Sequence, residues 1–257
     1  MRHLPIRSVL MPIAVMPPLP SKPRKSGLPP SVRPRQLSAD QRDAADATAV
    51  ASETGGLTLV ACGALAREIL AITEQFPAGM VDLTCLPASW HNHPEKIVPG
   101  LARKIRALRR EGRRIAVIYG DCGTSGALDA FLERENIDRI PGPHCYEMFM
   151  GKPDFESEME DQLGTFFLTD YMVRHFERIV MQGMGLRKHP QLRDMYFGNY
   201  TRVLYIAQTD DPSLQLKARS AADALGLAYE YRFAGLGMFP AFIADAVAGG
   251  QGASVTR

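Results

Sequence analysis

Four cysteines are the residues of this chain best suited to metal or redox chemistry, and three of them follow apolar runs. Cys62 ends the run LTLVAC, Cys85 lies in MVDLTCL, and Cys122 comes two residues after IAVIYG. Cys145 lies in the Pro/Gly-rich stretch PGPHCYE. Thiolates are preferred ligands of zinc and of iron–sulfur clusters. The first question is therefore whether the fold brings these sulfur atoms together.

The stretch GDCGTSG (120–126) places Cys122 between an expected strand and an expected helix. Gly120 and Gly123 permit a sharp turn and a close approach of the backbone to a ligand, and Thr124 can cap the helix. These three residues are candidates for contacting a bound cofactor. Amides at a helix N-terminus would favour the ionised form of the Cys122 thiol.

Histidines and a carboxylate near the cysteines extend the candidate site. His91 and His93 lie in SWHNHPEKI, and His144 precedes Cys145. His91 is the best candidate for a further metal ligand or an acid/base catalyst, and Glu147 for proton transfer. Further polar residues expected nearby are Asp121, Tyr146, Gln208 and Asp210.

Free cysteines also serve as small core residues, and no CxxC pair marks a local zinc site. Core packing is the better interpretation for Cys85, which lies inside an apolar strand. A functional role is favoured for Cys62, Cys122 and Cys145, which border glycines or prolines at the ends of elements.

The elements that must position these residues alternate along the chain. Strands are expected at 57–62, 80–86, 113–120, 201–208 and 228–233. Helices are expected at 64–76, 94–112, 124–136, 164–185, 189–200, 211–227 and 237–250. This order predicts an α/β fold: an open, mostly parallel sheet of about five strands flanked by helices, Rossmann-like or flavodoxin-like, with a helical insertion in the middle. Parallel strands end at one rim, where ligands of such sheets bind.

Composition divides the chain into a tail, residues 1–54, and a single α/β domain, residues 55–250. The tail is rich in Pro and basic residues and is expected to be disordered, with a targeting segment as a weaker possibility. The first 39 residues carry seven Lys or Arg and no acid, so the rest has 23 basic and 28 acidic residues. We therefore expect a cytoplasmic protein that binds neither nucleic acid nor membrane.

Five segments make the chain resemble the domain of unknown function 1638 family. They are ACGALAREI, LPASWHNHPEKI, YGDCGTSG, RIPGPHCYEMFMG and GTFFLTDYMVRHFERI with YFGNYTRVLYIAQ, in order across about residues 57–240. The resemblance implies that Cys62, His91, Cys122 and Cys145 fall on recurring polar positions, whereas Cys85 does not. WHNHP departs from a simpler Leu-His-Asn pattern, so the choice between His91 and His93 stays open.

The resemblance supplies no activity, although some members are encoded near corrinoid-dependent methyl-transfer systems. The residues themselves predict a metal-dependent enzyme in which Cys62, Cys122 and Cys145, with His91, hold an iron–sulfur cluster or zinc. Such a site would act on a small molecule as a lyase or in group transfer. The alternatives are a non-catalytic protein that delivers a metal or cofactor to a partner, such as a corrinoid methyltransferase, and a rim that binds only an organic ligand.

Overall fold

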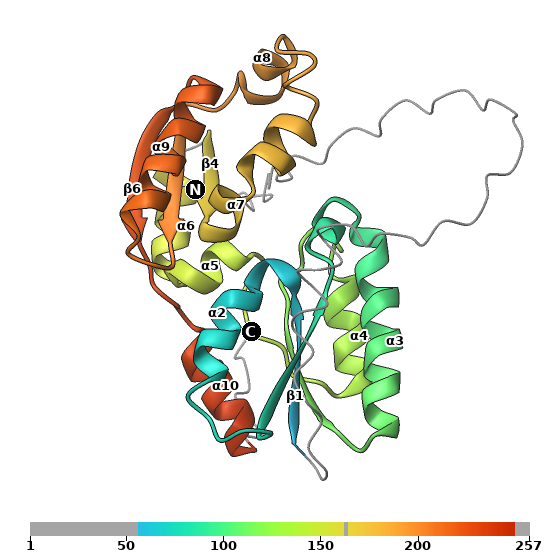
Figure 1. Cartoon of the computed structure of the whole chain (residues 1–257). Helices are drawn as coiled ribbons and strands as arrows, with labels where there is room; N and C mark the ends of the chain where they lie inside the picture. The colour runs from blue at the N-terminus through green and yellow to red at the C-terminus, as the bar shows by residue number, and fades with distance from the viewer. Residues whose placement is uncertain (1–55, 162–163, 250–257) are drawn as a thin grey trace, which may run out of the picture. The chain divides into compact units, whose positions relative to one another are not determined.

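The computed structural model describes residues 56–161 and 164–249 (Figure 1). The tail predicted at residues 1–54, with any targeting segment, lies outside the described residues. No helix in the described ranges is long and apolar enough to cross a membrane.

Six strands and a larger number of helices make up the described chain. The strands are β1 (Leu57–Cys62), β2 (Val81–Leu86), β3 (Arg114–Ile118), β4 (Thr165–Thr169), β5 (Arg202–Ala207) and β6 (Ala228–Phe233). The α-helices are α2 (Ala66–Thr73), α3 (Ile97–Arg110), α4 (Ala127–Glu135), α5 (Cys145–Met150), α6 (Lys152–Asp161), α7 (Asp170–Arg174), α8 (Leu192–Phe197), α9 (Pro212–Leu225) and α10 (Phe239–Ala248). Short helical turns η1 (Gly63–Leu65), η2 (Ala88–Asn92) and η3 (Pro94–Lys96) and the π-helix η4 (Glu177–Gln182) complete them.

The strands form two parallel sheets of three strands, ordered β2-β1-β3 and β4-β5-β6. The prediction of an α/β fold with parallel strands is confirmed, but the prediction of one sheet of about five strands is wrong. The error lies at 165–169, which was expected to begin a helix and is strand β4. Its sequence TFFLT is rich in aromatic and β-branched residues, which favour strands, and the helix starts only after Thr169, whose hydroxyl accepts the amide of Met172.

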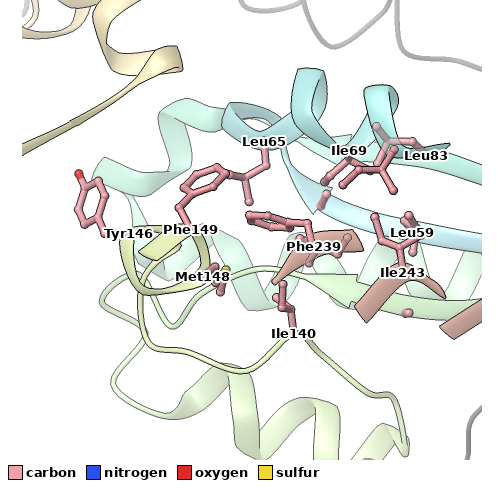
Figure 2. Close-up of a cluster of buried hydrophobic side chains, with 14 of the residues drawn as sticks. Leu59, Leu65, Ile69, Leu83, Ile140, Tyr146, Met148, Phe149, Phe239 and Ile243 are labelled. Atoms are coloured by element: carbon pink, nitrogen blue, oxygen red, sulfur yellow. The ribbon is translucent and has the colours of Figure 1, made fainter. Parts of the chain in front are cut away.

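Each sheet is covered by helices on both faces. In the first sheet, Val60 and Val117 pack with apolar residues of α3 and α4, while Leu59 faces Ile69 of α2 and Ile243 of α10. Figure 2 shows the apolar cluster that contains Leu59, Ile69 and Ile243. The C-terminal helix therefore packs against the first sheet although it follows the second sheet in sequence.

An arginine links the three strands of each sheet near their N-terminal ends. Arg113, just before β3, donates to Thr58 of β1 at 2.9 Å and pairs with Asp82 of β2. Arg202, at the start of β5, donates to Thr165 of β4 at 2.9 Å and pairs with Glu230 of β6. Both guanidinium groups are largely buried, so their carboxylate partners compensate a charge that water cannot reach.

Asp170 links β4 and β5 at their C-terminal ends. Its buried carboxylate accepts hydrogen bonds from the Tyr205 hydroxyl at 2.7 Å, the Gln208 amide at 3.0 Å, and the amide and hydroxyl of Thr209. Arg174 lies 3.6 Å away and supplies the compensating charge. Gln208, expected at the rim from the sequence, accepts the Asp170 amide at 2.7 Å and is thus part of this connection.

Replacing Asp170 by Ala should lower the free energy of unfolding by about 3 kcal/mol, because the buried donors of Tyr205 and Gln208 lose their acceptor. Urea-induced unfolding followed by circular dichroism measures this loss. Asp223→Ala on the exposed side of α9 is the control and should change stability by less than about 0.5 kcal/mol. Equal effects of the two substitutions would contradict the structural role of Asp170.

Candidate functional site

Cys62 and Tyr119 lie side by side at the C-terminal rim of the first sheet. Strand β1 is central in the sheet and pairs with β3 with Ala61 opposite Ile118, so the next residues on each strand are neighbours. The Tyr119 ring is fully buried. Two short apolar strands thus place a thiol and a phenol together at the rim.

The loop after Tyr119 is held in shape by Asp121. Its carboxylate accepts the amides of Ser125 at 3.1 Å and Gly126 at 3.0 Å, and the hydroxyl of Thr124. Helix α4 therefore begins at Ala127 rather than at residue 124. Within this loop Cys122 adopts a left-handed conformation, with φ of 46°, that side-chain-bearing residues rarely occupy. Such strain persists only where surrounding contacts enforce it and is concentrated at functional sites.

Cys145 reaches the same rim because the chain before it runs along the outer edge of β3. Arg139 forms a parallel bridge with Val117, and its guanidinium donates to the carbonyls of Ile140 and Gly142, both at 2.9 Å. This attachment brings residues 143–145 against residues 120–122.

Gly120 shows how close the two segments lie. A Cβ atom at Gly120 would come within 2.8 Å of the Pro143 carbonyl oxygen and 3.3 Å of the Cys122 sulfur. The amide of Cys122 points to the same carbonyl at 3.5 Å. Gly120 is thus required for the approach of the two segments, while its predicted contact with a cofactor stays a prediction, as does that of Gly123.

The thiols of Cys62, Cys122 and Cys145 are close enough to interact electrostatically with one another. Burial raises the pKa of each of them. Cys145 and Cys62 also raise the pKa of Cys122, and Cys62 contributes to the raised pKa of Cys145, which is about 12. All three are therefore neutral thiols at neutral pH in the metal-free chain. This differs from the expected ionisation of Cys122, because the amides near α4 bind Asp121 and not the sulfur.

In the described parts of the chain, no three Cys, His, Asp or Glu side chains stand close enough together to hold a metal ion. Cys85 packs against the apolar cluster of the first sheet, as Cys62 and Cys145 also do, and its raised pKa of about 12 is due chiefly to burial. Cys62 also influences Cys85 electrostatically.

Glu68 is a potential site residue that the sequence analysis missed. It lies on α2 and only 7% of it is exposed, yet its Oε2 atom has no hydrogen-bond partner. Its pKa is raised to about 7, chiefly by burial and also by Asp170, while Arg174 opposes the increase. Glu68 also raises the pKa of Cys145, which places this carboxylate near the thiols.

A helical period gives the signal that could have identified Glu68. Leu65, Ile69 and Ile72 are buried and lie three and four residues apart, and Glu68 occupies the same stripe. A single carboxylate on the buried side of an amphipathic helix needs a reason beyond packing.

The three histidines near the rim differ in exposure and in neighbours. His91 is half-buried in η2, and burial lowers its pKa. His144 is also half-buried; burial lowers its pKa and His91 lowers it further, so the two imidazoles lie close together. His93 is exposed and pairs with Glu95 at 3.5 Å. The geometry thus favours His91 over His93 as a residue that reaches the rim.

Glu147 and Thr124 have contacts of other kinds. Glu147 is buried and its pKa is raised by burial, but the charged groups that influence it are Lys152, Glu156 and Arg139 rather than the thiols. The Thr124 hydroxyl donates to Asp121 and accepts the Leu128 amide at 3.3 Å. The roles predicted for Glu147 in proton transfer and for Thr124 in cofactor binding stay predictions.

Buried polar atoms without partners gather around the thiols. In the described residues four such side-chain atoms occur: Glu68 Oε2, Tyr119 Oη, His144 Nδ1 and Tyr229 Oη. The first three belong to residues beside the cysteines. Tyr119 lies beside Cys62 and lowers the pKa of that thiol, although its hydroxyl has no hydrogen-bond partner. Three thiols, a carboxylic acid, a phenol and an imidazole could together bind a soft metal or transfer protons.

Comparison with known proteins gives one match. Residues 85–243, more than half of the chain, match the family described as "Protein of unknown function (DUF1638)". The matched range includes Cys122 and Cys145 and begins after Cys62 and Glu68. No curated protein and no solved structure matches the chain. The chain belongs to the DUF1638 family, as its sequence motifs predicted.

Proposed function

We propose that this protein is a metal-dependent enzyme in which Cys62, Cys122 and Cys145 hold an iron–sulfur cluster, with His91 as an additional ligand or acid/base residue. The observation that supports it is that three thiols from separate segments lie near enough to influence one another electrostatically, beside buried polar atoms that lack partners. Three cysteines leave one position of a cluster open for substrate, a centre suited to lyase chemistry on a small molecule. Zinc is the alternative metal, suited to group transfer.

The protonated thiols of the metal-free chain are compatible with such a centre. A metal replaces thiol protons when it binds, so thiols that are neutral in the metal-free chain deprotonate on binding it. The left-handed conformation of Cys122 and the close approach at Gly120 keep the backbone of both ligand segments in place.

An enzyme is favoured over a delivery protein because a proton-transfer group lies at the same place. Glu68 is almost completely buried, unpartnered and near Cys145, and its pKa of about 7 allows it both to donate and to accept a proton at neutral pH. In this proposal Glu68 exchanges protons with the substrate, and the Tyr119 hydroxyl and the His144 imidazole orient the substrate. A site that only transports metal has no use for these groups.

Removing any one of the three proposed cysteine ligands should abolish stable metal binding. The protein is purified without oxygen, and iron, zinc and acid-labile sulfide per chain are measured before and after gel filtration. Wild type should carry iron and sulfide with broad visible absorption, and Cys62→Ala, Cys122→Ala and Cys145→Ala should lose both. Zinc without colour selects the alternative metal, and metal lost from wild type during gel filtration favours delivery.

Cys85→Ala is the matched control, because Cys85 is a half-buried thiol on the neighbouring strand. It should retain the wild-type metal content. Wild-type protein that binds neither metal, even after reconstitution with iron and sulfide, would refute the proposal, as would equal losses in Cys85→Ala and Cys122→Ala.

Glu68 should make the metal-free protein less stable as the pH rises. Its carboxyl has a pKa of about 7 in the folded chain against 4.5 ordinarily, so the folded state binds the proton more tightly. The contribution of Glu68 to stability is therefore fully present below pH 4.5 and is lost between pH 4.5 and 7, by at most about 3 kcal/mol. Glu68→Gln should remove this decrease, and urea unfolding of both proteins from pH 4.5 to 8 measures it.

Glu74→Gln is the control on the same segment, because Glu74 is exposed at the end of α2. It should follow the wild-type pH profile. A wild-type profile that Glu68→Gln leaves unchanged would mean that Glu68 has an ordinary pKa, and its assignment to proton transfer would then fail.

A further inference from the structure

Strand β6 has an open outer edge. It is the last strand of the second sheet, and no strand in the described residues pairs with its far side (Figure 1). The Ala228 amide donates to the Thr201 carbonyl next to β5 at 3.1 Å, so even-numbered residues direct their peptide groups toward β5. Because these directions alternate along a strand, the open edge presents the peptide groups of Tyr229, Tyr231 and Phe233.

Large apolar side chains lie beside this edge. Tyr231 is 38% exposed and Phe233 is 57% exposed. Arg219 of α9 covers the Tyr229 ring at 4.7 Å, and Leu216, which is 67% exposed, lies one helical turn before Arg219 on the same side of α9. An exposed apolar strip next to unpaired backbone groups is a typical site of association.

We propose that β6 pairs antiparallel with β6 of a second copy of this chain, about a two-fold axis through Tyr231. The strand sequence AYEYRF supplies the charge complementarity. In this arrangement Tyr231 faces its own copy and exchanges two backbone hydrogen bonds with it, and Tyr229 faces Phe233. Glu230 then lies opposite Arg232 of the second copy, twice by symmetry, in pairs without backbone hydrogen bonds, where side chains approach most closely. The β4-β5-β6 sheets of the two copies then join into one sheet of six strands.

Neighbouring registers are disfavoured by charge. A two-fold axis at Glu230 would place that carboxylate opposite its own copy, and an axis at Arg232 would oppose two guanidinium groups. Like charges directly opposite one another destabilise a strand pair. The sequence of β6 therefore selects the register centred on Tyr231.

The charged residues keep partners within their own chain and still remain accessible. Glu230 pairs with Arg202, and its side chain is 48% exposed. Arg232 lies 3.4 Å from Asp154 and 3.6 Å from Glu158 of α6, with 38% of its side chain exposed. Contact with a second copy would extend this network. The pair of Glu230 with Arg202 can be kept, and the long surface pairs of Arg232 hold its side chain only weakly.

Charge substitutions at Tyr231 test the register directly, because only the residue on the axis faces itself. Wild type should reach twice the monomer mass as concentration increases in analytical ultracentrifugation. Tyr231→Lys alone and Tyr231→Glu alone should both remain monomeric, whereas an equimolar mixture of the two should form a dimer. Tyr231→Phe is the control and should behave as wild type. Circular dichroism and thermal unfolding verify that each variant is folded.

The proposal is overturned by a wild type that stays monomeric, by charged variants that still dimerise alone, or by a mixture that stays monomeric. Tyr231→Cys provides a second measurement that does not depend on disrupting the edge. Facing residues of an antiparallel pair have a Cα separation that a disulfide can span. Oxidised glutathione should therefore link Tyr231→Cys chains into covalent dimers, and the matched variant Tyr229→Cys should not be linked. Equal linkage of both variants, or of neither, contradicts this pairing.

Discussion

The attachment of residues 138–140 along β3 is the constraint on which the candidate site depends. Through the bridge between Val117 and Arg139, the chain is carried past the end of the strand, so that the start of α5 meets the loop that bears Cys122. Gly120 permits the contact and Asp121 fixes the loop. Without this attachment, Cys145 would have no reason to lie near thiols that precede it by more than twenty residues.

Desolvation gives the site its chemical character. Cys62, Cys122, Cys145 and Glu68 all have raised pKa values because burial penalises their charged forms. Asp170, by contrast, receives hydrogen bonds from three residues and links β4 to β5. A satisfied buried carboxylate holds a fold together, whereas Glu68, with an unpartnered oxygen beside neutral thiols, is available for a ligand or a proton.

Much of the fold could be predicted from the sequence, because strands β1, β2, β3, β5 and β6 have clear apolar patterns. Strand β4 could not, since TFFLT runs directly into the helix DYMVR and its apolar residues fit either structure. That omission produced one sheet in place of two. At the site, parallel strand ends predicted the proximity of Cys62 and Cys122, which their electrostatic interaction supports. Glu68 was missed for another reason: a carboxylate's role depends on which amides and charges surround it, and this is set by tertiary contacts.

Thiol protection tests the central claim most directly. Cysteines of the full chain are alkylated with and without bound metal, and the label at each residue is measured by mass spectrometry. We predict that metal protects Cys62, Cys122 and Cys145 together, while the labelling of Cys85 stays unchanged. Metal that protects none of these three thiols, or that protects Cys85 to the same extent, would contradict the proposed centre.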